Sequence, residues 1–363
     1  MKSIRLERVS KSYDGELIID NLSFEVKAGQ FFALLGPSGC GKTTVLRLLA
    51  GLETVDSGRI FLGDEDITYL PIHKRKINTV FQQYALFPHL TVFENVAYSL
   101  RIKKLPHDVV KTKVTDVLKM VRLLGFESKS PRSLSGGQQK RVALARALIG
   151  EPEVLLLDEP LAALDLKLKE EMLMEISQLQ DKLQTTFVYV THDQFEALTV
   201  SDQMAIMNPQ GDIEQKGTPK DIYEFPVSRF VANFVGNTNI IEGKLHIQQG
   251  QFQVEVEGLG FFGAYTPHEK LWMIPGCRLF MSVRPEKIFI SKKPKEGFAN
   301  HLTAKVIDII YYGRSTQYRV KLKNGQYLLV FEQNEEHFPQ ENIDYDDEVH
   351  LYFQKENVVL LEH

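Results

Sequence analysis

A glycine-rich loop near the N-terminus has the residues needed to bind the phosphates of a nucleotide. It runs from Gly36 to Thr43 in the pattern G-x-x-x-x-G-K-[ST], between an apolar stretch and a helical stretch. In this setting backbone N–H groups and the start of the helix bind phosphate oxygens. We therefore predict a nucleotide site in this loop, comprising Gly36, Pro37, Ser38, Gly39, Cys40, Gly41, Lys42, Thr43 and Thr44.

Individual positions of this loop have distinct expected roles. Lys42 can reach the β- and γ-phosphates, and the Thr43 hydroxyl can bind Mg²⁺. Thr44 lies where the helix start meets the α-phosphate. Cys40 is expected to be a small packing residue, since no activating partner for a catalytic thiol is evident in the sequence.

An acidic pair, Asp158-Glu159, follows the apolar run 154–157. Such a run predicts a central strand, and ligands of parallel sheets bind at the carboxyl ends of the strands. Asp158 is expected to hold Mg²⁺, and Glu159 to polarise the water that attacks the γ-phosphate. The preceding buried strand argues against a simple exposed acidic turn.

A third segment, Leu134-Ser135-Gly136-Gly137-Gln138, precedes a helical stretch. The serine and the glycines can open a helix whose free N–H groups form an anion site. The same residues could also form an ordinary serine-capped helix without a ligand. Its neighbours in the sequence, a phosphate loop before it and an acidic pair after it, favour the anion site.

Alternating strands and helices are predicted to position these segments. Apolar runs predict buried strands at 31–35, 154–157, 187–190 and 204–207, and the alternation of Leu22, Phe24 and Val26 predicts an N-terminal strand. A helix with one buried face is predicted from the spacing of Met172, Ile176, Leu179 and Leu183. This order predicts an α/β domain with a parallel sheet covered on both faces.

Beyond Gly236 the pattern changes to short strands only. Asn324-Gly325 predicts a two-residue hairpin, because both positions tolerate positive φ. We expect an α/β domain over 1–235 and an all-β, barrel-like domain over 236–363, joined through 225–239.

Composition excludes several classes of protein. The net charge of −4 is unfavourable for a broad nucleic-acid surface, so no nucleic-acid partner is expected. The two cysteines give no disulfide framework and fit a reducing cytosol. The N-terminus has no apolar signal core, and no apolar run reaches the ~18 residues of a membrane span.

The pentapeptide 134–138, placed between the phosphate loop and the acidic pair, resembles the signature of the ATP-binding cassette (ABC) family. The resemblance implies a P-loop NTPase of the ABC type that binds ATP and Mg²⁺. It also implies a head-to-tail homodimer, in which Leu134, Ser135, Gly136, Gly137, Gln138 and Asp165 of one chain face the ATP of the other.

Other motifs agree with this resemblance. Tyr13 matches the aromatic residue that stacks on adenine, and Gln82 matches the glutamine that contacts Mg²⁺ and the attacking water, although Gln83 is adjacent. His192 resembles the γ-phosphate switch histidine. With Glu159 these residues complete the expected catalytic set of Glu159, His192 and Gln82, and the expected metal set is Thr43, Gln82 and Asp158. Ala162 departs from the family, where serine is common.

The whole chain resembles the ATPase subunits of binding-protein-dependent importers. Their C-terminal domain is OB-like, of the TOBE or MOP type, and Val283-Arg284-Pro285-Glu286 resembles its Arg-Pro-Glu motif. The segments 77–96 and 213–219 look most like the spermidine/putrescine import ATPases, with sugar, ferric-ion and sulfate importers as alternatives.

This likeness implies partners as well as a location. They are two transmembrane permease subunits, met by the segment 84–89, and indirectly a periplasmic or extracellular substrate-binding protein. The expected location is the cytoplasmic face of the inner membrane. The C-terminal domain is expected either to stabilise the dimer or to regulate it.

Two classes of non-transport ABC protein are less compatible with the sequence. ATPases that maintain chromosomes carry a long coiled coil between the phosphate loop and the signature, and the interval here is too short for one. Ribosome-associated ABC proteins normally have two cassettes in one chain, whereas each motif occurs once here.

Overall fold

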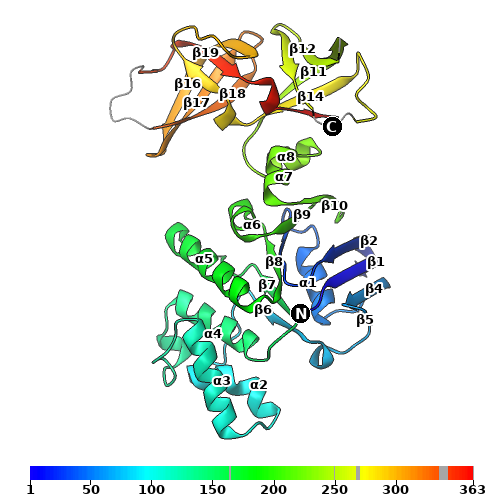
Figure 1. Ribbon diagram of the computed structural model, residues 1–363, viewed down its shortest axis with the longest axis vertical. Coiled ribbons are helices and arrows are strands. Elements are labelled where there is room, and N and C mark those ends of the chain that lie inside the picture. Colours follow the sequence, from blue (N-terminus) through cyan, green and yellow to red (C-terminus); the bar gives the residue numbers. More distant parts are fainter. Residues whose placement is uncertain (163–164, 249, 267–269, 335–341, 363) are drawn as a thin grey trace. The chain divides into compact units, whose positions relative to one another are not determined.

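The computed structural model describes residues 1–162, 165–248, 250–266, 270–334 and 342–362. These residues form two compact units, Met1–Asp221 and Ile222–His363. Figure 1 labels their elements, coloured from blue to red along the chain.

A mostly parallel sheet forms the centre of the first unit, in the strand order β10-β9-β3-β8-β7-β6. The strands are β3 (Phe31–Leu35), β6 (Ile77–Val80), β7 (Val154–Asp158), β8 (Thr186–Thr191), β9 (Gln203–Met207) and β10 (Ile213–Gly217). Only the β9–β10 pair is antiparallel. The four buried strands predicted from apolar runs are confirmed as β3, β7, β8 and β9.

A smaller antiparallel sheet lies in the same unit, in the order β2-β1-β4-β5. It comprises β1 (Ile4–Tyr13), β2 (Glu16–Val26), β4 (Ser57–Leu62) and β5 (Glu65–Asp66). The predicted N-terminal strand is β2, and its Leu22, Phe24 and Val26 are buried. Together with helix α1 (Lys42–Ala50) these strands enclose one of the unit's two apolar cores.

The second core of this unit lies among helices. It is built by α2 (Val92–Ile102), α3 (His107–Met120), α4 (Gly136–Leu148) and α5 (Leu166–Leu183), together with residues of the central sheet. The short α6 (Gln194–Val200) contributes Val200 to it. The predicted stripe is confirmed on α5, because Met172, Ile176 and Leu179 are buried. Figure 1 shows α2, α3 and α4 grouped together, apart from α1.

The second unit begins with a helical segment and continues as strands. Helix α7 (Pro219–Glu224) spans the division between the units, and α8 (Arg229–Phe234) follows. One five-stranded sheet has the order β13-β12-β11-β14-β20, comprising β11 (Asn239–Gln248), β12 (Gln251–Val256), β13 (Gly260–Ala264), β14 (Arg278–Val283) and β20 (Val358–Leu361). The other has the order β15-β19-β16-β17-β18, comprising β15 (Phe289–Ser291), β16 (Asn300–Tyr311), β17 (Ser315–Leu322), β18 (Tyr327–Gln333) and β19 (Glu348–Phe353). Both sheets contribute to one apolar core, which confirms an all-β C-terminal domain.

The hairpin predicted at Asn324-Gly325 joins β17 to β18, but its turn differs from the prediction. The Gly325 N–H donates to the Leu322 carbonyl at 3.0 Å, and only Gly325 of the pair has positive φ (87°). The Asn324 side chain instead accepts from the Gln326 N–H at 3.1 Å. The loop is therefore longer than two residues. The hydrogen bond to the Asn324 side chain stabilises a wider turn, with glycine at the left-handed position.

Arg284 holds the helical segment against the β-structure of the second unit. Its guanidinium donates to the carbonyls of Tyr223 (3.0 Å), Ala232 (2.8 Å) and Asn237 (3.0 Å). It also lies 4.2 Å from the centroid of the Tyr223 ring. All of these contacts lie within the second unit, which starts at Ile222, whereas the sequence led us to expect a boundary at 235–236.

Candidate functional site

The phosphate loop joins β3 to α1, and its glycines are required by close packing. Gly41 is the N-cap of α1 with φ 96°, and a Cβ there would lie 2.5 Å from Cδ1 of Ile19. At Gly36 a Cβ would lie 2.7 Å from Sγ of Cys40 and 2.8 Å from the Met207 carbonyl oxygen. The approach of the Met207 carbonyl at Gly36 leaves no space for a side chain, and the positive φ at Gly41 strongly favours glycine, so both positions of the loop require glycine.

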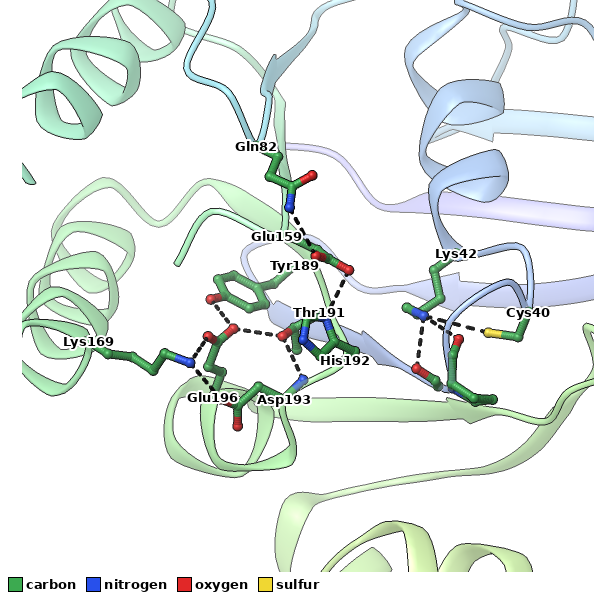
Figure 2. Close-up of polar contacts among 12 residues, drawn as sticks. Cys40, Lys42, Gln82, Glu159, Lys169, Tyr189, Thr191, His192, Asp193 and Glu196 are labelled. Carbon is green, nitrogen blue, oxygen red and sulfur yellow. Dashed lines mark hydrogen bonds and ion pairs between the residues drawn. The ribbon is translucent and has the colours of Figure 1, made fainter. Parts of the chain in front are cut away.

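Lys42 points along the inner side of this loop. Its Nζ atom donates to the carbonyl oxygens of Gly36 (2.8 Å) and Pro37 (2.7 Å), as Figure 2 shows. It lies 3.8 Å from Sγ of Cys40, whose thiol pKa is raised by burial. A thiol with a raised pKa is a poor nucleophile, which agrees with the packing role expected for Cys40.

Thr43 and Asp158 meet where α1 approaches the end of β7. Burial, with Glu159 adding to it, raises the pKa of the Asp158 carboxyl. A cavity of about 340 Å³ lies beside them, with Arg47 and Phe81 also in its wall. Two predicted metal residues and the neighbour of the third, Gln82, therefore surround one space.

The donors around this cavity fit Mg²⁺ better than a transition metal. In the described part of the chain, no group of three or more His, Cys, Asp and Glu side chains is arranged to hold an ion. A threonine hydroxyl, a carboxylate and an amide oxygen are hard oxygen donors, and Mg²⁺ prefers a few of these together with phosphate and water. Thr43, Asp158 and Gln82 would hold the ion, which would neutralise charge on the phosphates.

Glu159 is the meeting point of three segments that are far apart in the sequence. Nδ1 of His192 lies 3.0 Å from its Oε1 atom, and Nε2 of Gln82 donates to its Oε2 atom at 3.4 Å (Figure 2). The Glu159 N–H donates to the Val190 carbonyl at 2.9 Å, and its φ is 41°. This left-handed backbone is unusual for glutamate and sets the carboxylate between the two partners. The predicted catalytic residues are thus brought together.

A buried polar network behind His192 was not predicted from the sequence. Glu196 is buried and accepts hydrogen bonds from the Tyr189 hydroxyl and the Thr191 hydroxyl, both at 2.7 Å. Lys169 forms ion pairs with Glu196 (3.0 Å) and with Asp193 (2.6 Å), as drawn in Figure 2. The network fixes the chain on both sides of His192. The sequence did contain a signal for a buried Glu196. This residue precedes the apolar Ala197 and lies four residues before Val200, and all three are buried in α6.

Ser135 lies at the start of α4, away from the phosphate loop. Its Oγ atom accepts from the Gln138 N–H at 3.3 Å, and its own N–H donates to Oε1 of Gln138 at 3.0 Å. Ser135 and Gly136 are exposed, whereas Leu134 and Gly137 are buried. The structure therefore does not bring the pentapeptide to Lys42 within one chain, as the separation of α4 from α1 in Figure 1 shows.

The remaining predicted site residues lie at the ends of elements. Asp165 is exposed and caps α5 by accepting from the Leu168 N–H at 3.0 Å. Tyr13 is the last residue of β1, with Nζ of Lys11 at 5.3 Å from its ring centroid. Ala162 donates its N–H to the Glu159 carbonyl at 3.2 Å. The two residues between Ala162 and Asp165 lie outside the described part of the chain.

The chain is similar to known proteins over nearly its whole length. The sequence profile for the ABC transporter matches residues 19–162, and that for the TOBE domain matches residues 281–361. The chain is 44% identical to the spermidine/putrescine import ATP-binding protein PotA of Thermotoga maritima, over 99% of this chain and 98% of that protein. The chain belongs to the ABC transporter family. It is an ABC ATPase followed by a TOBE domain.

Other ABC proteins show the same likeness. The chain is 46% identical to the spermidine/putrescine import ATP-binding protein PotA of Vibrio cholerae, over 91% of this chain and 86% of that protein. The ABC cassette MJ0796, solved as a dimer in a post-hydrolysis state with ADP and Pi, matches 60% of this chain and 98% of its own, with 32% identity and a TM-score of 0.54. The cbiO1 protein of Clostridium perfringens, part of the ABC transporter complex cbiONQ, gives 32% identity and a TM-score of 0.58 over 61% of this chain and 90% of its own.

Proposed function

We propose that this chain is the ATP-hydrolysing subunit of an ABC importer for spermidine and putrescine. The observation that carries the ATPase mechanism is the contact of Glu159 with both His192 and Gln82 at the end of the central sheet. The cargo is inferred from relatives of nearly the same length that are named as spermidine/putrescine import proteins. No residue of this chain is expected to touch the polyamine.

In the proposed mechanism, ATP binds to residues 36–44 with its adenine against Tyr13. Lys42 would contact the β- and γ-phosphates, while Thr43, Asp158 and Gln82 would hold Mg²⁺. Glu159 polarises the attacking water, and His192 orients the carboxylate and contacts the γ-phosphate. Catalysis of this kind depends mainly on positioning and on charge stabilisation.

The active site is proposed to be complete only in a homodimer. Ser135 and Gly136 are exposed at the start of α4 and do not reach Lys42 of their own chain. A second chain in head-to-tail orientation would bring residues 134–138 and Asp165 to the γ-phosphate. Closure of the dimer around two ATP molecules would then drive transport, and hydrolysis would reset it.

The proposed membrane partners are two permease subunits, contacted through residues 84–89. Among the helices in the described part of the chain, none has the length and apolar character needed to cross a bilayer. From the likeness to import ATP-binding proteins, we place the chain on the cytoplasmic face of the membrane, with a substrate-binding protein on the opposite side. ATPase activity is assigned to residues 1–235, and dimer stabilisation or regulation to residues 236–363.

Uptake of radiolabelled spermidine by the reconstituted transporter tests this proposal. Uptake should require ATP and should be competed by putrescine, but not by sugars, ferric ion or sulfate. The K42A variant supplies the matched control without nucleotide-dependent uptake. Competition by a sugar, ferric ion or sulfate, with no effect of polyamines, would assign the chain to that other importer class.

A further inference from the structure

Arg146, in the last turn of α4, contacts the loop that carries Gln82. Its guanidinium donates to the Tyr84 carbonyl at 2.8 Å and to the Ala85 carbonyl at 2.6 Å. It also lies 5.5 Å from the centroid of the Phe87 ring. Burial lowers the pKa of Arg146 from its ordinary value, but the group stays charged because an arginine pKa is so high. One side chain therefore binds two consecutive carbonyls of this loop.

The backbone at these two carbonyls is in an unfavourable conformation. Tyr84 has φ 58° and Ala85 has φ 45°, although neither residue is glycine. Left-handed residues other than glycine, asparagine and aspartate persist when surrounding contacts hold them there. The two hydrogen bonds from Arg146 supply such contacts, and they act directly after Gln82 and Gln83.

The far end of the same loop is held by a different helix. Asn95 of α2 is fully buried; its side-chain amide accepts from the Phe87 N–H at 2.9 Å and donates to the Phe87 carbonyl at 3.1 Å and the Leu90 carbonyl at 3.2 Å. Residues 87–90 are thus anchored on α2. Residues 84–85 are anchored on α4, so the position of Gln82 depends on Arg146 more than on Asn95.

Helix α4 has the signature at one end and Arg146 at the other. Ser135 caps the helix start, and Arg146 lies in the last turn. An α-helix of this length is a stiff element about 20 Å long. Any displacement of the signature end is therefore carried to the carbonyls of Tyr84 and Ala85.

We propose that Arg146 is a positioning residue that joins the signature helix to the Gln82 loop. It holds the strained backbone at 84–85 so that Gln82 stays directed at Glu159. It also makes the proposed permease-facing segment 84–89 move together with α4. The inference rests on the proposed role of Gln82 in hydrolysis and on no assumption about the cargo.

The test uses the full-length chain with R146M, the conservative variant R146K and Q82A. A matched control is R122M, because Arg122 is an exposed arginine that bonds to Glu175 on α5 and makes no contact with residues 81–90 in the described interactions. R146M should lower the kcat of ATP hydrolysis about tenfold and leave KM within about twofold, since misplacement of a positioned group affects the reaction more than binding. R146K, which retains one charged donor group, should lie between R146M and the wild type.

Hydrogen exchange gives a second readout that global destabilisation would not reproduce. Amides of residues 82–90 should exchange about tenfold faster in R146M, while those of β7 and β8 should keep wild-type rates. R122M should match the wild type in both measurements. If R146M is too unstable to purify, R146K is expected to show the same local pattern with a smaller amplitude.

Several results would overturn the proposal. They are an unchanged kcat in R146M, unchanged exchange at 82–90, or faster exchange throughout the first unit, which would indicate a general structural role. If Q82A retains the wild-type kcat, the proposed role of Gln82 fails. In that case faster exchange confined to residues 82–90 in R146M would still support the role of Arg146 in holding this loop on α4.

Discussion

Nδ1 of His192 lies 3.0 Å from Oε1 of Glu159, on the opposite side of the carboxylate from the Gln82 amide at 3.4 Å. Each oxygen of Glu159 thus has its own partner. These two contacts fix the plane of the carboxylate, which is the kind of positioning that phosphoryl transfer requires.

Replacing Glu159 with glutamine keeps the shape of this side chain but removes its charge. E159Q should reduce ATP hydrolysis by about 100-fold or more, because a neutral amide cannot polarise the attacking water. ATP affinity should stay near the wild-type value, and the closed dimer should accumulate. Single-turnover phosphate release and equilibrium binding measure the two effects. Wild-type turnover in E159Q would remove Glu159 from the mechanism.

The S135A variant separates a role in the partner's site from a role in helix stability. Loss of the cap should cost about 1 kcal/mol of folding free energy. Hydrolysis should fall about tenfold through the loss of a donor to the partner's γ-phosphate, while ATP binding to the single chain remains. S228A is the control, since Ser228 caps α8 in the second unit by accepting from the Val231 N–H. Equal losses of hydrolysis in both variants, or failed ATP binding in S135A, would contradict the expectation.

Lys140 of α4 should make the stability of the first unit depend on pH. It is 2% exposed, its Nζ atom has no hydrogen-bond partner among the described residues, and burial lowers its pKa to about 7, opposed by Glu196 and assisted by Lys169. The native state releases this proton near pH 7, whereas the unfolded chain keeps it up to the ordinary value of 10.5. Between these values the unfolded state binds more protons, so the wild type gains stability as pH rises.

The K140M variant has no such titration and serves as the comparison. The free energy of unfolding of the wild type, relative to K140M, should rise by at most about 1.4 kcal/mol per pH unit above pH 7. Urea titrations followed by exchange of the β7 and β8 amides measure this difference. K119M, at an exposed lysine of α3, controls for the removal of a lysine side chain from the surface. A flat difference between wild type and K140M would mean that Lys140 keeps its ordinary pKa.

Arg284 should be essential for anchoring residues 223–237 to the β-structure of the second unit. R284M leaves three carbonyl partners without their donor, and an unsatisfied buried polar group costs about 1–3 kcal/mol. We expect cleavage by trypsin or chymotrypsin within 223–237 to accelerate about tenfold or more, with a loss of about 3 kcal/mol in stability of that unit. R278M, at the exposed start of β14, is the control. Unchanged cleavage in R284M would show that other contacts suffice.

The sequence predicted those parts of the fold and site that depend on local pattern. Apolar runs located β3, β7, β8 and β9 to within one residue at either end. Glycines with the required spacing located the phosphate loop, since only residues without a side chain fit at Gly36 and Gly41. The expected role of Glu159 followed from an acidic pair after a buried strand, and those of His192 and Gln82 from family likeness. The structure adds that both of these residues contact Glu159.

Other features depend on contacts between distant residues and could not be predicted. The contact of Arg146 with the carbonyls of Tyr84 and Ala85 spans about 60 positions. The left-handed backbone of these residues has no local signal, because tyrosine and alanine do not favour it. Arg284 was recognised only as part of a motif. Its hydrogen bonds to residues 223–237 became evident from the fold.

The Arg284 contacts also bear on how this protein can be cut and recombined. A fragment that ends at 235 would keep α8 but lose the guanidinium that binds the Ala232 carbonyl, and would expose the buried Val231 and Ala232. A C-terminal fragment that starts at Ile222 would keep arginine and carbonyls together. The portable module for domain exchange among related proteins therefore starts within α7, ahead of α8 and of its first β-strand.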